Sequence, residues 1–538
     1  MTEPKIYVYT RAYNAEKTIR RAIESVLNQS YPNISYLIQD NGSTDGTYAI
    51  CREYADKDSR IILVHNEINN RYSAREEKEY QLILSYIWGE ALGASDFFCL
   101  LDADDEYLPD FFERAVRFFQ TENLDIIATG TEMIKEETGR KISEQCWPHD
   151  IVITGSDFLN YFPNYHWYMR QVWGKLYRRH CLIGIQEQAN IFLKHELGDA
   201  AQKGLAYGDD TLRTLYAFQK AERIGFLAGL GHRYYIQNKS VSTNLSENRI
   251  ASDRILHKAT LNFLTEKCGS ISENNRAFLN AVYANAISDT VGVIANSNLS
   301  PAEKLCNYRN IAEHSFTRIA YRWKGDAIKN SRRHLLACAC NAVLALPEDA
   351  DDADFCAIMR VLCPNCGMVV DRKTLPLIVN KQLQENFLQD NRDAFVKELL
   401  KTAKGSANNL LGKMLQRLAS NNPILSWVDD PIFIRDYGTI YWTVWQSNYP
   451  EALDEMAGLI LDEKVQNAQE TFYRLFIDLA AKLEQANAFI FGKIRLAQFY
   501  LMQNLYKECD TLVTELEELG LSEEAEIAAL RKTLNRNC

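Results

Sequence analysis

The chain has 538 residues and a formal net charge of −11 at pH 7. Because hydrophobic cores stop growing at about 250 to 300 residues, a chain of this length is expected to form two or three domains. The acidic charge and the lack of clustered Lys and Arg argue against a nucleic-acid partner, since neutralising phosphates requires such clusters.

The amino-terminal sequence MTEPKIYVYT has no basic segment followed by an apolar stretch, so no leader peptide is expected. A run of about 18 uncharged apolar residues, long enough to span a bilayer, is also missing. We therefore expect a cytoplasmic protein that associates with membranes at most peripherally.

The 13 cysteines are odd in number and scattered, which favours reduced thiols over a disulfide framework. Two short motifs leave a four-thiolate zinc site open as an alternative, namely Cys338 with Cys340 and Cys363 with Cys366. Buried structural thiols are favoured, because the CxC half departs from the usual zinc-ribbon spacing.

Short apolar runs alternate with amphipathic stretches in the first part of the chain, a pattern typical of βα units that feed a mostly parallel sheet. The pattern predicts strands at residues 5–10, 34–39, 61–65 and 97–101. It predicts helices at residues 15–28, 45–55 and 76–92. From about residue 247 onward, apolar residues recur at intervals of three and four, which predicts helices only.

The expected fold is therefore an α/β domain at residues 1–245, a helical extension at 246–330 and an all-helical domain at 331–538. In the last domain, the spacing of one group of residues resembles a tetratricopeptide helix pair. These are Leu496, Ala497, Tyr500, Asn504, Tyr506, Cys509, Val513 and Leu516. An irregular helical bundle fits the pattern equally well. We expect these helices to recruit an acceptor or to join subunits in a homo-oligomer.

Four short polar motifs carry the chemistry of the first domain. They are the segments 10–14 (TRAYN), 39–45 (QDNGSTD), 102–105 (DADD) and 208–210 (GDD). Three of them follow predicted strands, at the edge where open α/β sheets form their ligand crevice.

The DADD segment follows two leucines that end a buried strand, so it would present three acidic side chains at the tip of that strand. Adjacent carboxylates repel one another, and a hard divalent ion that bridges them to phosphate oxygens relieves that repulsion. The alternative is a solvated acidic turn before a helix, because Pro109 and the acids after it suit a helix start.

Taken in order, the motifs resemble family-two glycosyltransferases of the GT-A fold, from about residue 5 to residue 242. That family usually shows P-x-Y-N, S-x-x-x-Q, D-D/N-G-S-x-D, A-R-N, L-D-x-D-D, W-N-K-L-Y-R-R, E-D and Y-x-Y, in this order. The matching segments here are Tyr13-Asn14, Ser25 with Gln29, Asp40 to Asp45, Ala74-Arg75, Leu101 to Asp105, Trp173 to Arg179, Asp209-Asp210 and Tyr234-Tyr235.

Three segments depart from the family pattern. The run Thr10-Arg11-Ala12 replaces I-P-T, Glu76 replaces the Asn of A-R-N, and Gly174 replaces the Asn of W-N-K. These departures leave the expected metal and base positions intact.

The resemblance implies a metal-dependent, inverting hexosyltransferase that uses a nucleotide-sugar donor, with a UDP-sugar favoured. Asp40 would accept a hydrogen bond from the imide N–H of a uracil ring. The backbone near Thr10, Ala12 and Tyr13 would line the base, and the nucleotide would also contact Asn14, Asp40, Asn41, Arg75, Asp102 and Ala103. Asp104, with Asp102, would hold Mn²⁺ or Mg²⁺, which neutralises the departing diphosphate.

An inverting transfer also needs a base on the face of the sugar opposite the leaving group, and the resemblance assigns that role to Asp210. The alternative is an acid that stabilises the amino-terminal end of a helix at residues 211–220. Trp173, Lys175 and Asp209 form a candidate acceptor site. The acceptor would be a glycan, a lipid-linked glycan, a protein or a peptide.

Two other functions remain open. Nucleotidyl transfer also uses metal-bound carboxylates at sheet edges, but no Gly-rich phosphate-binding loop with Lys follows the first strand. A non-catalytic protein that binds sugars or nucleotides, or acts as a scaffold, is the second alternative, and intact Asp104 and Asp210 argue against it.

Overall fold

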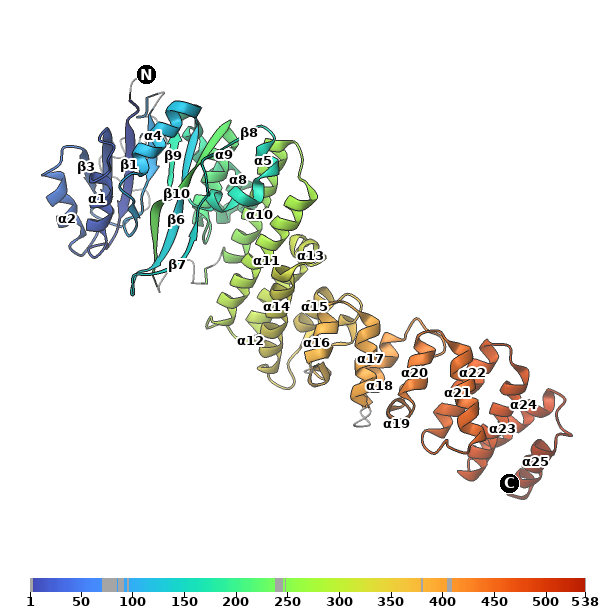
Figure 1. Ribbon diagram of the computed structural model, residues 1–538. Coiled ribbons are helices and arrows are strands. Elements are labelled where there is room, and N and C mark those ends of the chain that lie inside the picture. The colour runs from blue at the N-terminus through green and yellow to red at the C-terminus, as the bar shows by residue number, and fades with distance from the viewer. Residues whose placement is uncertain are drawn as a thin grey trace. The chain divides into compact units, whose positions relative to one another are not determined.

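The computed structural model describes residues 3–69, 85, 91–93, 96–237, 245–246, 248–378, 381–403 and 409–537. Contacts between residues divide the chain into two compact units. The first comprises Met1–Ser297 with Arg322–Ile328, and the second comprises Asn298–Tyr321 with Lys329–Cys538. The predicted fold class is confirmed, because a sheet with helices occupies the first unit and the described part of the second unit is helical (Figure 1).

Within the described residues, ten strands form one sheet in the order β3-β2-β1-β4-β9-β6-β10-β5, with β7 beside β6 and β8 beside β10. The strands are β1 (Ile6–Ala12), β2 (Ile34–Asp40), β3 (Ile61–His65), β4 (Phe97–Leu100), β5 (Glu106–Tyr107), β6 (Ile126–Lys135), β7 (Arg140–Gln145), β8 (Ile151–Thr154), β9 (Lys175–Arg178) and β10 (Arg223–Ile236). The pairs β3-β2, β2-β1, β1-β4 and β6-β10 are parallel, and the other pairs are antiparallel. The carboxyl ends of β1 to β4 therefore share one edge of the sheet.

The four early strands agree with the sequence prediction to within two residues at each end. The helices of the first unit are α1 (Ile19–Leu27), α2 (Thr47–Ala55), α4 (Phe111–Glu122), α5 (Asp157–Asn160), α6 (Phe162–Tyr165), α7 (Arg179–Leu182), α8 (Ile185–Leu197), α9 (Asp209–Lys220), α10 (Arg249–Cys268) and α11 (Glu273–Ala295). The helix predicted at residues 76–92 lies almost entirely outside the described residues.

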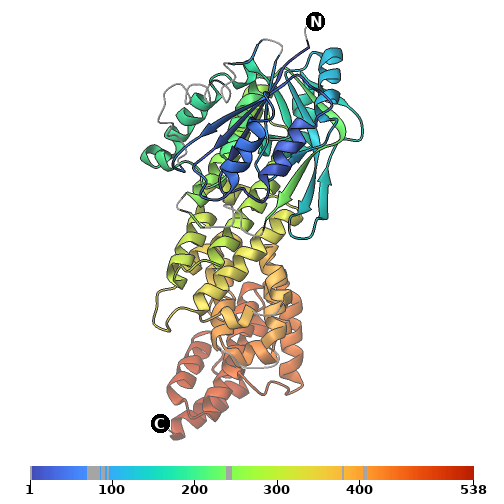
Figure 2. The same cartoon turned by 90° about the vertical axis from the view of Figure 1, so that its left-hand side faces the viewer.

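Alternation of side chains along the strands fills two cores, one on each face of the sheet. On β1, Val8 packs in a cluster with Ile23 of α1 and Phe112 of α4. The next residue, Tyr9, belongs to the cluster on the other face, with Phe218 of α9 and Phe263 of α10. The ribbon views show helices packed beside the sheet (Figures 1 and 2). Helices therefore cover both faces of the sheet, and α10 is one of these helices.

The first unit ends later than the boundary expected at residue 245. Both α10 and α11 contribute residues to the core that also contains β1 and α9, among them Phe263 and Leu279. The periodicity of the sequence shows where strands give way to helices, but it does not show which core the helices join.

The helix α11 is long and apolar enough, by length and composition alone, to cross a membrane. Of its apolar stretch, 44% is buried inside the fold. Its Leu279 and Phe278 pack in the core of the first unit that also contains Tyr9, as expected for a core helix.

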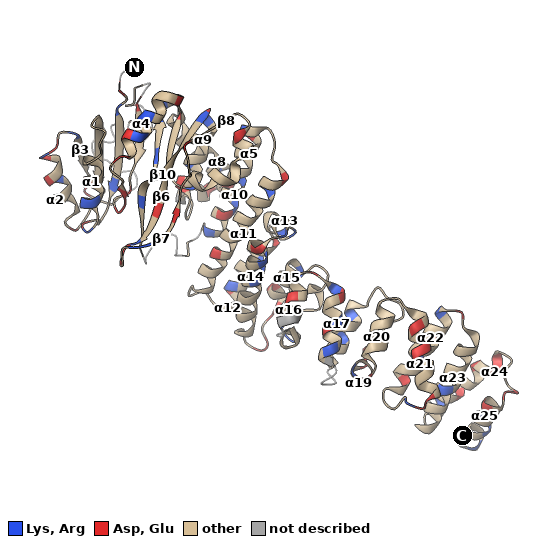
Figure 3. Cartoon of the chain, viewed as in Figure 1, with Lys and Arg blue, Asp and Glu red and all other residues tan. Residues whose placement is uncertain are grey.

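The helices of the second unit are α12 (Pro301–Glu313), α13 (Ser315–Ala320), α14 (Asp326–Leu344), α15 (Ala353–Leu362), α16 (Lys381–Leu388), α17 (Arg392–Ala403), α18 (Asn409–Leu418), α19 (Pro431–Asp436), α20 (Gly438–Trp445), α21 (Tyr449–Leu461), α22 (Gln469–Lys482), α23 (Ala486–Met502), α24 (Tyr506–Glu518) and α25 (Ala525–Asn537). The first residues of α14 belong to the first unit. From α20 onward, each helix packs against the next one in sequence. Acidic and basic residues are interspersed along these helices (Figure 3).

One turn recurs between these consecutive helices. A residue with positive φ follows the helix, at Ser447, Glu463, Glu484 and Asn504. The next residue donates its N–H to a carbonyl five positions earlier, as from Leu505 to Tyr500 at 2.9 Å. This is the Schellman arrangement, which satisfies the last carbonyls of a helix. A succession of helix pairs with such turns suits a solenoid, and the tetratricopeptide assignment stays a prediction.

The four cysteines considered for zinc do not form a metal site in the described structure. The Cys363 thiol donates to Asp390 Oδ1 at 2.8 Å, and the Cys366 N–H donates to Cys363 Sγ at 3.2 Å. The Cys338 thiol interacts with the hydroxyl of Tyr308 instead. Among the described residues, no three His, Cys, Asp or Glu side chains gather as ligands of one ion.

We predict that a chain ending at residue 250 is far less stable than one ending at residue 330. The shorter chain lacks α10, which buries Ile255, Ala259, Phe263 and Leu264. Burying one large apolar side chain contributes about 1.5 to 3 kcal/mol, so the loss is comparable with the whole stability of a domain. Thermal unfolding and soluble yield measure this. Equal melting temperatures for the two chains would contradict the placement of α10 in the core.

Candidate active site

Three of the four polar motifs meet at the shared edge of the sheet. Ala12 at the end of β1 pairs with Asp40 at the end of β2, and Leu101 follows the neighbouring strand β4. A cavity of about 420 Å³ opens beside them. It is lined by Arg11, Tyr13, Asn14, Ala15, Thr18, Asn41, Asn69, Asp102, Ala103, Asp104 and Gln237.

Two predicted nucleotide residues do not turn their side chains into this cavity, so the contact expected of them is one through the backbone. The side chains of Thr10 and Ala12 are buried. The Thr10 hydroxyl contacts the Tyr36 hydroxyl at 2.9 Å and donates to Leu101 O at 2.8 Å. The Thr10 side chain therefore supports the edge of the sheet. The residues beside it in this segment that line the cavity are Arg11 and Tyr13.

Asp40 is buried at the end of β2, and a histidine holds one of its oxygens. The Nδ1 atom of His65 lies 2.6 Å from Asp40 Oδ2. Asp40 Oδ1 has no hydrogen-bond partner among the described residues. The ring of Tyr48 packs on His65 with its centroid 4.1 Å away. The carboxylate is thus fixed by His65, and one buried acceptor oxygen is left over.

Sequence reasoning missed His65, which lies far from Asp40 in the chain. Asp40 pairs directly with His65 in the parallel register of β2 and β3. The sequence held one signal for this pair, because Asp40 directly follows one predicted strand and His65 ends the next.

Asn14 and Asn41 hold the loops around the cavity together. Asn14 has φ of 49°, and its side-chain oxygen accepts from Thr44 N at 2.8 Å. Asn41 Nδ2 donates to Asn69 Oδ1 at 2.6 Å, and its Oδ1 accepts from Asn66 Nδ2 at 3.0 Å. Asn adopts a left-handed backbone more readily than most residues, which suits this turn. Both asparagines line the cavity while their amides bond to the protein.

The acidic turn after β4 presents two carboxylates to the cavity, those of Asp102 and Asp104. Burial, followed by the nearby carboxylates of Asp210 and Asp104, raises the pKa of Asp102 to about 7. Burial also raises the pKa of Asp104. Gln237 Nε2 donates to Asp104 Oδ2 at 2.9 Å. This is the environment of carboxylates that gain stability from a cation.

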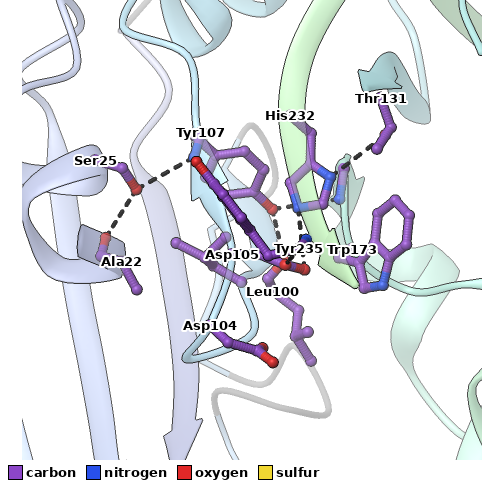
Figure 4. Close-up of polar contacts among 12 residues, drawn as sticks. Ala22, Ser25, Leu100, Asp104, Asp105, Tyr107, Thr131, Trp173, His232 and Tyr235 are labelled. Atoms are coloured by element: carbon purple, nitrogen blue, oxygen red, sulfur yellow. Dashed lines mark hydrogen bonds and ion pairs between the residues drawn. The ribbon is translucent and has the colours of Figure 1, made fainter. Parts of the chain in front are cut away.

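The third acid, Asp105, does not point into the cavity, contrary to the prediction of three acids at the tip. Figure 4 shows its side chain directed toward His232 and Tyr235. Asp105 Oδ1 accepts from Tyr235 N at 2.9 Å, and Oδ2 lies 3.6 Å from His232 Nε2. Burial raises the pKa of Asp105 well above its usual value and lowers that of His232 to about 3. Asp105 therefore ties the acidic turn to β10.

Arg21 of α1, which sequence reasoning did not single out, holds the same turn from the opposite side. Its guanidinium donates to Asp104 O, forms an ion pair with Glu136 at 2.9 Å and lies 3.5 Å from the ring centroid of Tyr235. No local motif marks this arginine, because its partners lie in the turn after β6, on β10 and in the acidic turn.

Asp210 lies in the first turn of α9, after Gly208, whose φ is 84°. Its carboxylate is exposed and lies 3.8 Å from the Arg213 guanidinium. Its charge is one of the causes, after burial, that raise the pKa of Asp102. Asp210 is not among the described residues that line the cavity, so its place fits an acid that stabilises a helix start, and its role as a base stays a prediction.

Two residues of the candidate acceptor site are buried. The ammonium of Lys175 donates to Gln171 O at 2.7 Å and to Trp173 O at 3.0 Å, and burial lowers its pKa to about 7. The Trp173 ring stacks on His232 and Tyr234 with centroids 4.4 and 5.4 Å away. The prediction that Lys175 contacts an acceptor is therefore corrected, because its donors support the loop from Gln171 to Gly174. Asp209 stays a candidate at the start of α9.

Gly174, which replaces the expected Asn, has φ of 67°. A Cβ atom there would meet only ordinary contacts, the nearest being Thr131 Oγ1 at 3.8 Å. The position thus selects for a left-handed backbone, which Gly and Asn share.

Arg75 and Glu76, and residues 240–242 of the closing segment, lie outside the described residues.

The sequence matches a family model described as Glycosyl transferase family 2 over residues 7–182. The chain is 25% identical over 273 residues to the uncharacterized glycosyltransferase YibD of Escherichia coli (strain K12). This alignment covers 48% of this chain and 72% of YibD. An uncharacterized glycosyltransferase of Haemophilus influenzae is 30% identical over 191 residues, which is 34% of this chain and 55% of that relative. This chain also aligns with EpsE of Bacillus subtilis (strain 168), which is described as a putative glycosyltransferase, and the alignment covers only 45% of the length of EpsE.

Among solved structures, the S. aureus TarS fragment 1–349 in complex with UDP-GlcNAc shares 14% identity with this chain. The alignment covers 73% of this chain and 89% of that chain, with a TM-score of 0.35. The family model and the named relatives support a glycosyltransferase domain of family 2 in the first unit. The resemblance that the motifs indicated is confirmed over residues 7–182.

We predict that Gly174→Ala lowers the free energy of unfolding by about 1 kcal/mol, because Ala is strained at positive φ. Gly174→Asn should lose clearly less, since Asn tolerates this conformation. Thermal unfolding of both variants measures the difference. An Ala variant as stable as the Asn variant would contradict the backbone explanation.

Proposed function

We propose that the first unit is a metal-dependent, inverting glycosyltransferase that moves a hexosyl group from a nucleoside diphosphate sugar, with a uridine donor favoured. The observation that carries the proposal is the cavity lined by Asp102 and Asp104, together with the charge of Asp210, which acts on Asp102. The family match over residues 7–182 supports the reaction class.

The base of the donor would bind at the end of β2. Asp40 Oδ1 is a buried acceptor without a partner among the described residues, and such an oxygen is costly unless a donor fills it. The imide N–H of uracil supplies that donor, while His65 keeps Oδ2 in place. Asp40 is fully buried, so the base reaches it only when covering side chains move.

Asp104, with Asp102, would hold Mn²⁺ or Mg²⁺. Two protein carboxylates suffice, because Mg²⁺ is commonly bound by one or two carboxylates together with phosphate oxygens of the substrate. The ion supplies positive charge at the diphosphate as it departs. Arg21 and Gln237 fix the backbone and the side chain of Asp104, respectively.

Asp210 would accept the proton of the acceptor hydroxyl. As that oxygen forms its bond to the anomeric carbon, the bond from this carbon to the diphosphate breaks, and the diphosphate leaves with the electron pair. Attack opposite the leaving group inverts the anomeric centre. The acceptor is a glycan, a lipid-linked glycan or a protein, and the enzyme is proposed to act in the cytoplasm.

We predict that UDP binding requires a divalent ion, because clustered carboxylates repel a diphosphate. Calorimetry with Mn²⁺ should show binding that chelation with EDTA weakens by roughly tenfold or more. Asp104→Ala should remove this metal-dependent part. The matched control is Asp110→Ala, which removes an exposed carboxylate that pairs with Arg114. Equal UDP affinity with and without chelator would contradict the prediction.

We predict that Asp210→Asn lowers the release of UDP from the preferred donor by roughly 10² or more, because the amide cannot accept a proton. Donors are screened across uridine, guanosine and thymidine diphosphate sugars. UDP affinity should stay unchanged, since its contacts come from other elements.

The control for that variant is Asp157→Asn, which alters an acid in the first turn of α5 in the same way. If Asp210 only stabilises the start of α9, both variants retain near-normal turnover, because Asn suits helix starts.

A further inference from the structure

The loop that leads into α9 is fastened to α10 by its backbone. Ala206 N donates to Ser252 Oγ at 2.9 Å, and Asn248 Nδ2 donates to Gly204 O at 2.7 Å. Both anchors lie within the first unit. They fix the chain only a few residues before Asp210.

A side-chain contact strengthens this attachment next to the acidic pair. The Tyr207 hydroxyl donates to Asp253 Oδ1, and Asp253 is 4% exposed. The Arg249 guanidinium lies 4.9 Å from the centroid of the Tyr207 ring and donates through Nε to Thr290 Oγ1 at 3.3 Å. Tyr207 is thus held at its ring and at its hydroxyl.

The next residue packs against the same helix. Gly208 has φ of 84°, and a Cβ atom there would lie 2.4 Å from Leu256 Cδ1. A larger residue would force the Leu256 side chain or the loop to shift, and it would be strained at this positive φ. Gly208 therefore permits both the turn into α9 and the close approach of the loop.

We propose that Tyr207 and Asp253 form a clamp that positions Asp210 for proton transfer. This inference rests on the proposed function, and it makes Tyr207 and Asp253 positioning residues. Tyr207 lies three residues before Asp210, so a shift of its ring moves the first turn of α9. A displacement of about 1 Å at a reacting group costs up to roughly 10² in rate.

The protonation state of Asp253 determines which substitution should preserve its contact with Tyr207. Burial raises the pKa of Asp253 to about 8; the Thr290 hydroxyl lowers it, Asp289 of α11 raises it and Arg254 of α10 lowers it. At neutral pH the neutral carboxylic acid is therefore the main form. Its closest isostere is Asn, whose oxygen accepts the Tyr207 hydroxyl hydrogen bond.

The test measures UDP release from the preferred donor by the full chain, together with UDP affinity by calorimetry. Tyr207→Phe should lower kcat by roughly tenfold or more while donor KM and UDP affinity stay unchanged. Tyr165→Phe is the matched control, because it also removes one buried tyrosine hydrogen bond, to Phe158 O at 2.6 Å. Its kcat should stay near that of the unmodified protein.

Asp253→Asn should retain kcat within about threefold, whereas Asp253→Ala should lose as much as Tyr207→Phe. Normal kcat in Tyr207→Phe, equal losses in Tyr207→Phe and Tyr165→Phe, or equal losses in the two Asp253 variants would each overturn the clamp. If Asp210→Asn is inactive in these cases, the proposed base stands and only the clamp fails. An active Asp210→Asn variant overturns the base assignment and the clamp together.

Discussion

The candidate site depends on holding the carboxylates of Asp102 and Asp104 partly buried at one edge of the sheet, with the charge of Asp210 acting on Asp102. Burial and these neighbouring charges raise the pKa of Asp102 to about 7. Like charges stay together only where the surrounding structure fixes each backbone. The parallel strands fix Asp102 and Asp104, and α9 fixes Asp210. A cation with a diphosphate would relieve the repulsion, which is why this arrangement suits a nucleotide-sugar donor.

The buried polar contacts around the site follow from that requirement. Asp105 turns inward to β10, and Arg21 holds the carbonyl of Asp104 from α1. His65 orients Asp40 at the next strand end. Each contact joins residues distant in sequence, so the site depends on the sheet register and on both helical layers. The helix α10 belongs to this support, because it contributes to the core and holds the loop before Asp210.

The strands and the order of the motifs could be predicted from sequence, because alternating hydrophobicity and turn residues are local signals. The convergence of Asp40 and Asp102 at one edge followed from the rule for parallel strands. The direction in which a single side chain points could not be predicted from the sequence in this way. Asp105 lies beside Asp104 in sequence yet faces the core, and Lys175 is buried although the segment Trp173 to Arg179 is rich in basic residues. Those outcomes depend on strand register and on partners far along the chain. The boundary near residue 245 also differed, since periodicity identifies a helix without showing which core it joins.

The most direct test of the account follows the anomeric proton of the sugar released from the preferred donor, by proton NMR with water as acceptor in the presence of Mn²⁺. The account predicts that the first sugar released has the anomeric configuration opposite to that in the donor, before mutarotation sets in, and that EDTA stops its release. Release with retained configuration, or release that proceeds unchanged in EDTA, would contradict it.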